Sequence, residues 1–183
     1  MKNIIAILSI LIIIVNCRNP VEPELNARFR NGDFEDGENK PENWEIWTPN
    51  ANGYTWSLDD KVFYSGKRSL KSKRSPGYTL VGKYTFFRQL ITDFRGGNEI
   101  IFSAFVRTST IFYGTAALAI KFLDNNDNIL DLQATDKFIT GSKSWKRYFV
   151  ESFIPENTKK IYVYCIHDGD GQAWFDSASV FLE

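Results

Sequence analysis

The chain has 183 residues, and its 22 basic and 22 acidic side chains leave no net charge. No global electrostatic field therefore favours nucleic acid or an acidic polymer as a partner. Two cysteines are too few for a disulfide framework or a cysteine-based zinc site. The length suits one ordinary domain with a substantial hydrophobic core.

Residues 1–16 differ from everything that follows them. Lys2 gives this segment a positive start, and residues 4–15 contain a single polar side chain, Ser9. The apolar run is shorter than the roughly 20 residues that a membrane-spanning helix needs. Its charge and length are typical of a secretory signal, so we predict that residues 1–16 are removed during export.

The apolar run ends in Ile-Val-Asn-Cys, with the cysteine at position 17. This resembles a lipobox, although asparagine and isoleucine stand where a small residue and leucine are usual. The resemblance implies that residues 1–16 are a lipoprotein signal peptide, that Cys17 is lipidated, and that the domain is anchored in the cell envelope, outside the cytoplasm. Residues 17–28 contain prolines and charges, which indicate an extended tether. The alternative is that Cys17 merely follows an ordinary cleavage site.

From residue 29 onward, apolar and polar residues mostly alternate. The period of two in residues 54–58, 101–107 and 117–122 predicts strands with two distinguishable faces. Turn signals rich in glycine, asparagine and aspartate separate these runs, and no convincing helix is present. Many short strands predict a single all-β domain over residues 29–183, with Cys165 as a small buried core residue.

Five segments, in order, resemble carbohydrate-binding modules of families 4, 9 and 22, which share a galactose-binding-like jelly roll. They are NGDFEDG with a following PENW (31–44), YSGKRSL (64–70), RQLI with IFSAFVR (88–107), the strand that begins with tryptophan (145–155) and AWFDSASV (173–180). The resemblance implies a jelly-roll β-sandwich of two antiparallel sheets whose first and last strands are neighbours. It also implies that Trp44 closes one end of the sandwich.

The resemblance further implies a structural calcium ion where the two ends of the domain meet. Transferred residue by residue, the side-chain ligands would be Glu35 and Asp176, and backbone carbonyls near Asp33 and Lys67 would complete the site. Calcium takes about six to eight oxygen ligands, so this donor set suits it. Ser177 stands where the modules commonly have a second acidic residue. The alternative is that Glu35 and Asp176 merely cap turns.

Sugar binding is the function that the resemblance implies. Sugar-binding sites pair exposed aromatic rings with a few planar polar groups, and this chain has 5 tryptophans, 8 tyrosines and 15 phenylalanines, more than one core of this size needs. We expect Arg107 and Lys121 to project onto one face beside the aromatic residues. The candidates for contact with a polysaccharide or glycan are Trp47, Tyr54, Trp56, Tyr84, Phe87, Gln89, Arg107 and Lys121. For each aromatic candidate, the alternative is a place in the core.

The residues nominate no catalytic machinery. No serine in the chain has a nucleophile-elbow motif around it to pair with the single histidine, His167, which we expect to lie in a loop over residues 167–171. No particular pair of carboxylates stands out for glycoside hydrolysis. We therefore expect a non-catalytic binding protein that touches the membrane only through its lipid and does not bind nucleic acid. The alternative is a protein-interaction, adhesion or structural lipoprotein with an envelope protein as its partner.

Overall fold

The computed structural model describes residues 29–48, 53–75, 84–136 and 138–183. The expected signal peptide (1–16), tether (17–28) and lipidated Cys17 lie outside the described residues and stay predictions. The described part of the chain contains β-strands and no helix, so it holds no helix long and apolar enough to cross a membrane. This confirms the all-β fold class.

The described residues form nine strands, and every pairing between them is antiparallel. In chain order the strands are β1 (Glu45–Trp47), β2 (Tyr54–Asp59), β3 (Ser69–Arg74), β4 (Tyr84–Ile91), β5 (Glu99–Leu123), β6 (Ile129–Ala134), β7 (Ile139–Phe153), β8 (Lys160–Gly169) and β9 (Gln172–Leu182).

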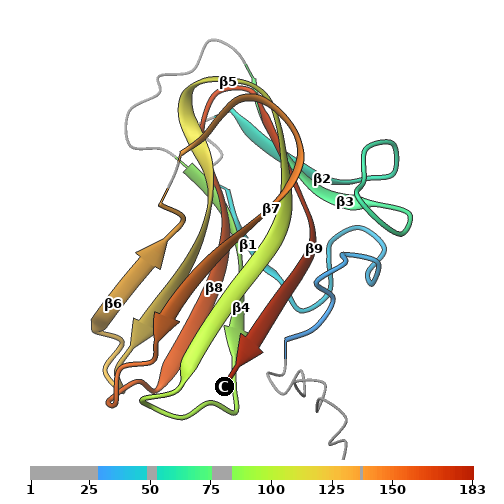
Figure 1. The fold of residues 1–183 in the computed structure, drawn as a ribbon. Helices are drawn as coiled ribbons and strands as arrows, with labels where there is room; N and C mark the ends of the chain where they lie inside the picture. The colour runs from blue at the N-terminus through green and yellow to red at the C-terminus, as the bar shows by residue number, and fades with distance from the viewer. Residues whose placement is uncertain (1–28, 49–52, 76–83, 137) are drawn as a thin grey trace, which may run out of the picture.

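The strands make two layers that are joined through β5 (Figure 1). The first, called the β9 layer here, has the order β2-β3-β9-β5-β7 and uses the first half of β5. The second, called the β8 layer, has the order β1-β4-β8-β5-β6 and uses the second half of β5. The predicted sandwich is therefore confirmed, with one strand running through both of its layers.

The bend of β5 explains how one strand serves both layers. Sequence alternation predicts two separate strands at 101–107 and 117–122, and the structure shows that these are the two halves of β5. Between them the backbone takes positive φ at Thr110 (56°) and Gly114 (106°), and the register with β7 shifts. A Cβ at Gly114 would lie 2.1 Å from the Asp168 carbonyl oxygen, too close for any side chain. Glycine therefore permits the close crossing of β5 and β8.

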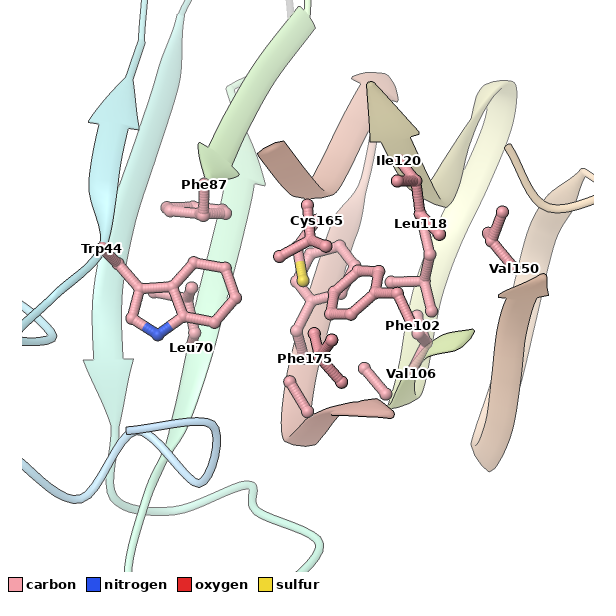
Figure 2. Close-up of a cluster of buried hydrophobic side chains, with 14 of the residues drawn as sticks. Trp44, Leu70, Phe87, Phe102, Val106, Leu118, Ile120, Val150, Cys165 and Phe175 are labelled. Carbon is pink, nitrogen blue, oxygen red and sulfur yellow. The ribbon is translucent and has the colours of Figure 1, made fainter. Parts of the chain in front are cut away.

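The core lies between the two layers, where alternate side chains of each strand meet. Figure 2 shows Phe87, Leu118 and Cys165 of the β8 layer in one cluster with Phe102 and Phe175 of the β9 layer. All five are fully buried. Burial raises the pKa of the Cys165 thiol, as expected for a thiol in apolar surroundings, and confirms the prediction of a core cysteine.

The loop at the start of the domain meets the last strand, β9, whereas the first strand, β1, pairs with β4 in the other layer, so the expectation that the first and last strands are neighbours is wrong. The Ala178 N–H donates to the Gly32 carbonyl oxygen at 2.7 Å, and a Cβ at Gly32 would lie 2.0 Å from the Ala178 carbonyl oxygen. The positive φ belongs to Asn31 (51°), so Gly32 is needed for close approach. Trp44 is buried beside this junction, and its indole N–H donates to the Asn31 carbonyl oxygen at 2.9 Å.

Candidate functional site

The outer face of the β8 layer contains a pocket of about 350 Å³, called the outer pocket here. Its floor is the second half of β5, where Leu118 and Ile120 point into the core and the small side chains of Ala117 and Ala119 point outward. Larger side chains of β4, β8 and β6 rise on either side of this floor. The lining residues are Tyr84, Phe86, Arg88, Thr115, Ala117, Ala119, Lys121, Leu132, Tyr164, Ile166 and Asp168.

One wall of the outer pocket is aromatic. The Trp47 ring is 46% exposed and stacks on Phe86, with centroids 5.3 Å apart and planes 15° apart. It also contacts Tyr84, which is 41% exposed, at 5.5 Å. The Thr85 hydroxyl donates to the Trp47 carbonyl oxygen at 2.9 Å and so helps to hold β1 against β4. The wall thus presents large, positioned rings to solvent, as flat apolar ligand surfaces require.

Two cations border the same pocket. The Arg88 guanidinium pairs with the Glu45 carboxylate at 2.7–2.8 Å and lies 4.3 Å from the centre of the Tyr162 ring. Burial acts to lower the pKa of Arg88, but hydrogen bonds to Tyr164 and Glu45 outweigh burial and raise it. The Lys121 ammonium lies 5.3 Å from the centre of the Tyr164 ring.

An acidic residue lies at the other end of the pocket. Asp168 pairs in the sheet with Tyr84 on one side and Thr115 on the other. Burial raises the pKa of its carboxyl, and the charge of Arg74 partly offsets this effect. The outer pocket is therefore apolar along its length and charged at both ends.

Three of the predicted contact residues lie together at this site. Tyr84 and Lys121 line the outer pocket, and Trp47 extends its aromatic wall. They come from β4, β5 and β1; β1 and β4 are neighbours in the β8 layer, and β8 lies between β4 and β5.

Phe87 and Gln89 face the other way, which corrects the prediction that they contact a ligand. Phe87 is fully buried among the core side chains (Figure 2). Gln89 is 4% exposed, and its amide accepts from the Arg30 N–H at 2.8 Å and donates to the Arg30 carbonyl oxygen at 2.9 Å. Because successive residues of a strand point to opposite faces, a pocket lined by Tyr84 excludes these two.

Tyr54, Trp56 and Arg107 lie away from the outer pocket. Tyr54 is buried, and its hydroxyl bonds to both backbone groups of Gly169 at 2.7–3.0 Å. Trp56 packs against the core beside a separate groove between β1 and β2. Arg107 is exposed on the β9 layer, with its guanidinium 5.9 Å from the centre of the Trp174 ring. The bend of β5 places Arg107 and Lys121 in different layers.

Several residues of the pocket were missed in the sequence, although a signal for them exists. Phe86 and Arg88 lie two and four residues after Tyr84 on β4, so all three side chains point to the same face of the sheet. The choice of Tyr84 would therefore have identified the other two. Tyr164 directly precedes the core residue Cys165 on β8, so its side chain points to the opposite, outer face. Ala117, on the floor, gave no signal, because a small residue in a strand does not reveal which side chains surround it.

His167 lies at the end of β8, and not in a loop. It is fully buried, and burial lowers its pKa to about 4. Its Nε2 lies 2.9 Å from the Asp170 carbonyl oxygen, which can only accept, so Nε2 carries the hydrogen. Nδ1 then accepts from the Ser72 hydroxyl at 2.9 Å. Because Ser72 is also fully buried, this serine–histidine pair has no access to a substrate.

Asp176 binds backbone groups where the predicted calcium ion would lie. Its Oδ2 accepts from the N–H groups of Tyr64 and Ser65 at 2.7 and 3.1 Å. Its Oδ1 accepts from the N–H and hydroxyl of Ser177 at 2.6 and 3.3 Å. Burial raises the pKa of the Asp176 carboxyl, and these N–H donors partly offset burial.

Glu35 binds the next stretch of the same loop. Its Oε1 accepts from the N–H groups of Lys67 and Arg68 at 2.7 and 3.1 Å. The side chain of Arg68 donates in turn to the Glu35 carbonyl oxygen. Gly66 has φ 67°, and a Cβ there would lie 2.3 Å from Oε1, so glycine allows the loop to wrap around the carboxylate.

These contacts bear on the calcium prediction. A carboxylate has about four acceptor positions, and the four donors on Asp176 fill them. Asp33 is exposed, and its carboxylate accepts from the Glu35 N–H at 3.4 Å. Within the described residues, no group of three or more His, Cys, Asp and Glu side chains is placed to hold a metal ion. As they are placed, the residues do not fit the predicted calcium ion.

Comparison with known proteins identifies the fold. No protein-family model and no curated protein matches the chain. Among solved structures, the enzymatically active domain of bacteriophage CBA120 tailspike protein 4 has a TM-score of 0.67 at 18% identity, over 86% of this chain and 21% of that chain. This chain therefore spans about a fifth of the tailspike chain.

Two carbohydrate-binding modules match over almost their whole length. The CBM22-1 xylan-binding domain of Paenibacillus barcinonensis Xyn10C has a TM-score of 0.58 at 15% identity, over 86% of this chain and 93% of that one. TmCBM61, in complex with β-1,4-galactotriose, has a TM-score of 0.53 at 15% identity, over 86% and 99%. The resemblance to carbohydrate-binding modules is thus confirmed at the level of the jelly-roll fold.

Proposed function

We propose that this protein is a non-catalytic carbohydrate-binding protein that holds a polysaccharide or glycan in the outer pocket. The observation that carries the proposal is an open hollow with a floor of Ala117 and Ala119 beside the exposed rings of Trp47 and Tyr84. A sugar presents a flat apolar face and a rim of hydroxyls. The rings suit that face, and the charged groups at the pocket ends suit the hydroxyls.

The charges at the outer pocket support binding over catalysis. Glycoside hydrolysis needs two carboxylates on either side of the scissile bond. Among the lining residues that the structure describes, Asp168 alone carries a carboxylate. Glu45, just beyond the lining, is paired with Arg88.

We propose further that a lipid on Cys17 holds the domain at a membrane of the cell envelope, outside the cytoplasm. The apolar run before Cys17 and the proline-containing segment after it support this proposal. The test is phase partitioning of the expressed protein in detergent. The native protein should enter the detergent phase and Cys17→Ser should not; a Cys17→Ser protein that still partitions would exclude lipidation.

Sugar binding is tested by electrophoresis of purified protein through gels that contain polysaccharides. Native protein should be retarded by at least one polysaccharide, and Trp47→Ala should weaken that retardation strongly. Trp145→Ala is the matched control, because Trp145 lies on β7 in the β9 layer and contacts Tyr64 at 6.1 Å, away from the pocket. Equal losses in both variants, or no loss in Trp47→Ala, would refute the assignment of the site.

A second candidate function is protein interaction through β7. Phe149 and Phe153 are 62% and 71% exposed and share one face of this strand. Large exposed side chains on one face of a strand can form part of a partner-binding surface. If no polysaccharide in a broad panel retards the protein, an envelope protein bound at this strand becomes the leading proposal.

A further inference from the structure

The two cations of the outer pocket differ in how they are neutralised. Of the four ion pairs among the described residues, two lie near the same end of the pocket: Arg88 pairs with Glu45 at 2.7 Å, and Lys160 pairs with Asp127 at 2.7 Å. Lys121 takes part in none of the ion pairs that the described residues form. Of the two cations in the pocket lining, Lys121 is therefore the one without an ion-pair partner among the described residues.

The surroundings of Lys121 make the positive charge of its ammonium available to a ligand. Its neighbours across the sheet are Tyr162 on β8 and Leu132 on β6, which carry no charge. Its ammonium lies over the Tyr164 ring at 5.3 Å from the centroid, and its side chain is partly buried. An ammonium beside apolar and aromatic groups attracts an anion more strongly than one in open water does.

The opposite end of the pocket has the opposite sign. Asp168 lies beside Thr115 in the sheet, and Thr115 is six residues from Lys121 along β5. At about 3.3 Å per residue, this places some 20 Å between the acidic end and the basic end. An anionic group on a bound chain is therefore attracted to one end of the pocket and repelled from the other.

We infer that the ligand of the outer pocket is an anionic sugar polymer, with a carboxylate or sulfate group of the chain bound by the Lys121 ammonium. This inference rests on the proposed sugar-binding function and adds the chemical class of the sugar. The rings of Trp47 and Phe86 bind the sugar faces, and Lys121 sets which end of the pocket takes the anionic group. The lysine ammonium acts as a point charge, so it can bind either a carboxylate or a sulfate.

The test compares each anionic polymer with the same polymer after its charge has been removed. Polygalacturonate and its carboxyl-reduced form test the carboxylate, and a sulfated galactan and its desulfated form test the sulfate. Affinities are measured by calorimetry with the purified protein. The variants are Lys121→Gln, Lys121→Arg and, as a control, Lys146→Gln, since Lys146 lies 5.6 Å from the Tyr148 ring in the β9 layer.

At least one anionic polymer is expected to bind about tenfold tighter than its neutral counterpart. Lys121→Gln should abolish this difference, Lys121→Arg should retain it, and Lys146→Gln should leave it unchanged. Added salt should weaken only the anionic polymer. The pair that shows the difference identifies carboxylate or sulfate.

Three outcomes would overturn the inference. Equal binding of charged and neutral polymers, lost in Phe86→Ala, would refute the anionic class and leave sugar binding intact. A charge preference that survives in Lys121→Gln would refute the role of Lys121. No binding by any polymer, charged or neutral, would refute the inference together with the proposed function.

Discussion

Two adjacent phenylalanines on β4 offer a direct comparison between the pocket and the core. Phe86 lines the outer pocket, and Phe87 points from the same strand into the core. Replacing each by alanine removes the same atoms from opposite faces of one sheet. Phe86→Ala should therefore mainly affect binding, and Phe87→Ala should mainly affect the free energy of unfolding.

The expected magnitudes follow from the surroundings of each ring. Phe87 is fully buried and contacts the Phe175 ring at 6.3 Å across the sandwich, so its removal should cost about 3–5 kcal/mol of stability. Phe86 is half-buried and contacts Trp47 and Tyr164 at 5.3 Å each. Its removal should cost roughly 1–2 kcal/mol of stability. The loss of its apolar surface to a bound sugar should weaken affinity by about 10- to 100-fold.

Urea unfolding and calorimetric titration measure the two quantities on the same proteins. At urea concentrations where it is still folded, Phe87→Ala should bind the sugar with native affinity, although its urea midpoint of unfolding should be lower. If Phe87→Ala lost affinity while Phe86→Ala bound normally, the orientation of β4, and with it the outer pocket as the binding site, would be refuted.

Three further predictions concern stability. Burial lowers the pKa of His167 from 6.5 to about 4, so folding disfavours its protonation. The free energy of unfolding should therefore fall by about 3 kcal/mol as pH drops from 7 to 4. His167→Gln should reduce this dependence of the free energy of unfolding on pH. Gly32→Ala should lower the free energy of unfolding by roughly 2–3 kcal/mol, because its Cβ would meet the Ala178 carbonyl oxygen, and an unchanged urea midpoint would contradict the close approach. Since Glu35 and Asp176 are occupied by N–H donors, the melting temperature should not respond to a chelator; a rise on adding calcium would instead show that these carboxylates bind the ion.

The fold could be predicted from the sequence, because period-two alternation and glycine-containing turns are visible in it. The orientation of β4 could not be predicted. Its core face carries Thr85, Phe87 and Gln89, and its outer face carries Tyr84, Phe86 and Arg88, so both faces mix polar and aromatic residues. Gln89 is buried because its amide bonds to the backbone of residue 30, and that partner is distant in sequence.

The bend of β5 could not be predicted from the sequence either. Arg107 and Lys121 both alternate outward from the core, and alternation alone places them on one surface. The positive φ at Gly114 turns the strand between them into the other layer. The floor of the outer pocket depends on this bend, because it brings Ala117 and Ala119 beside β8 and β6.

The proposed function depends most on which layer of the sandwich contacts the sugar. The indole N–H signals of Trp47 and Trp145, assigned by NMR in the purified protein, report on the β8 layer and the β9 layer respectively. Titration with an oligosaccharide of the bound polymer should shift the Trp47 signal and leave the Trp145 signal in place. A shift of Trp145 with an unmoved Trp47 would contradict the account.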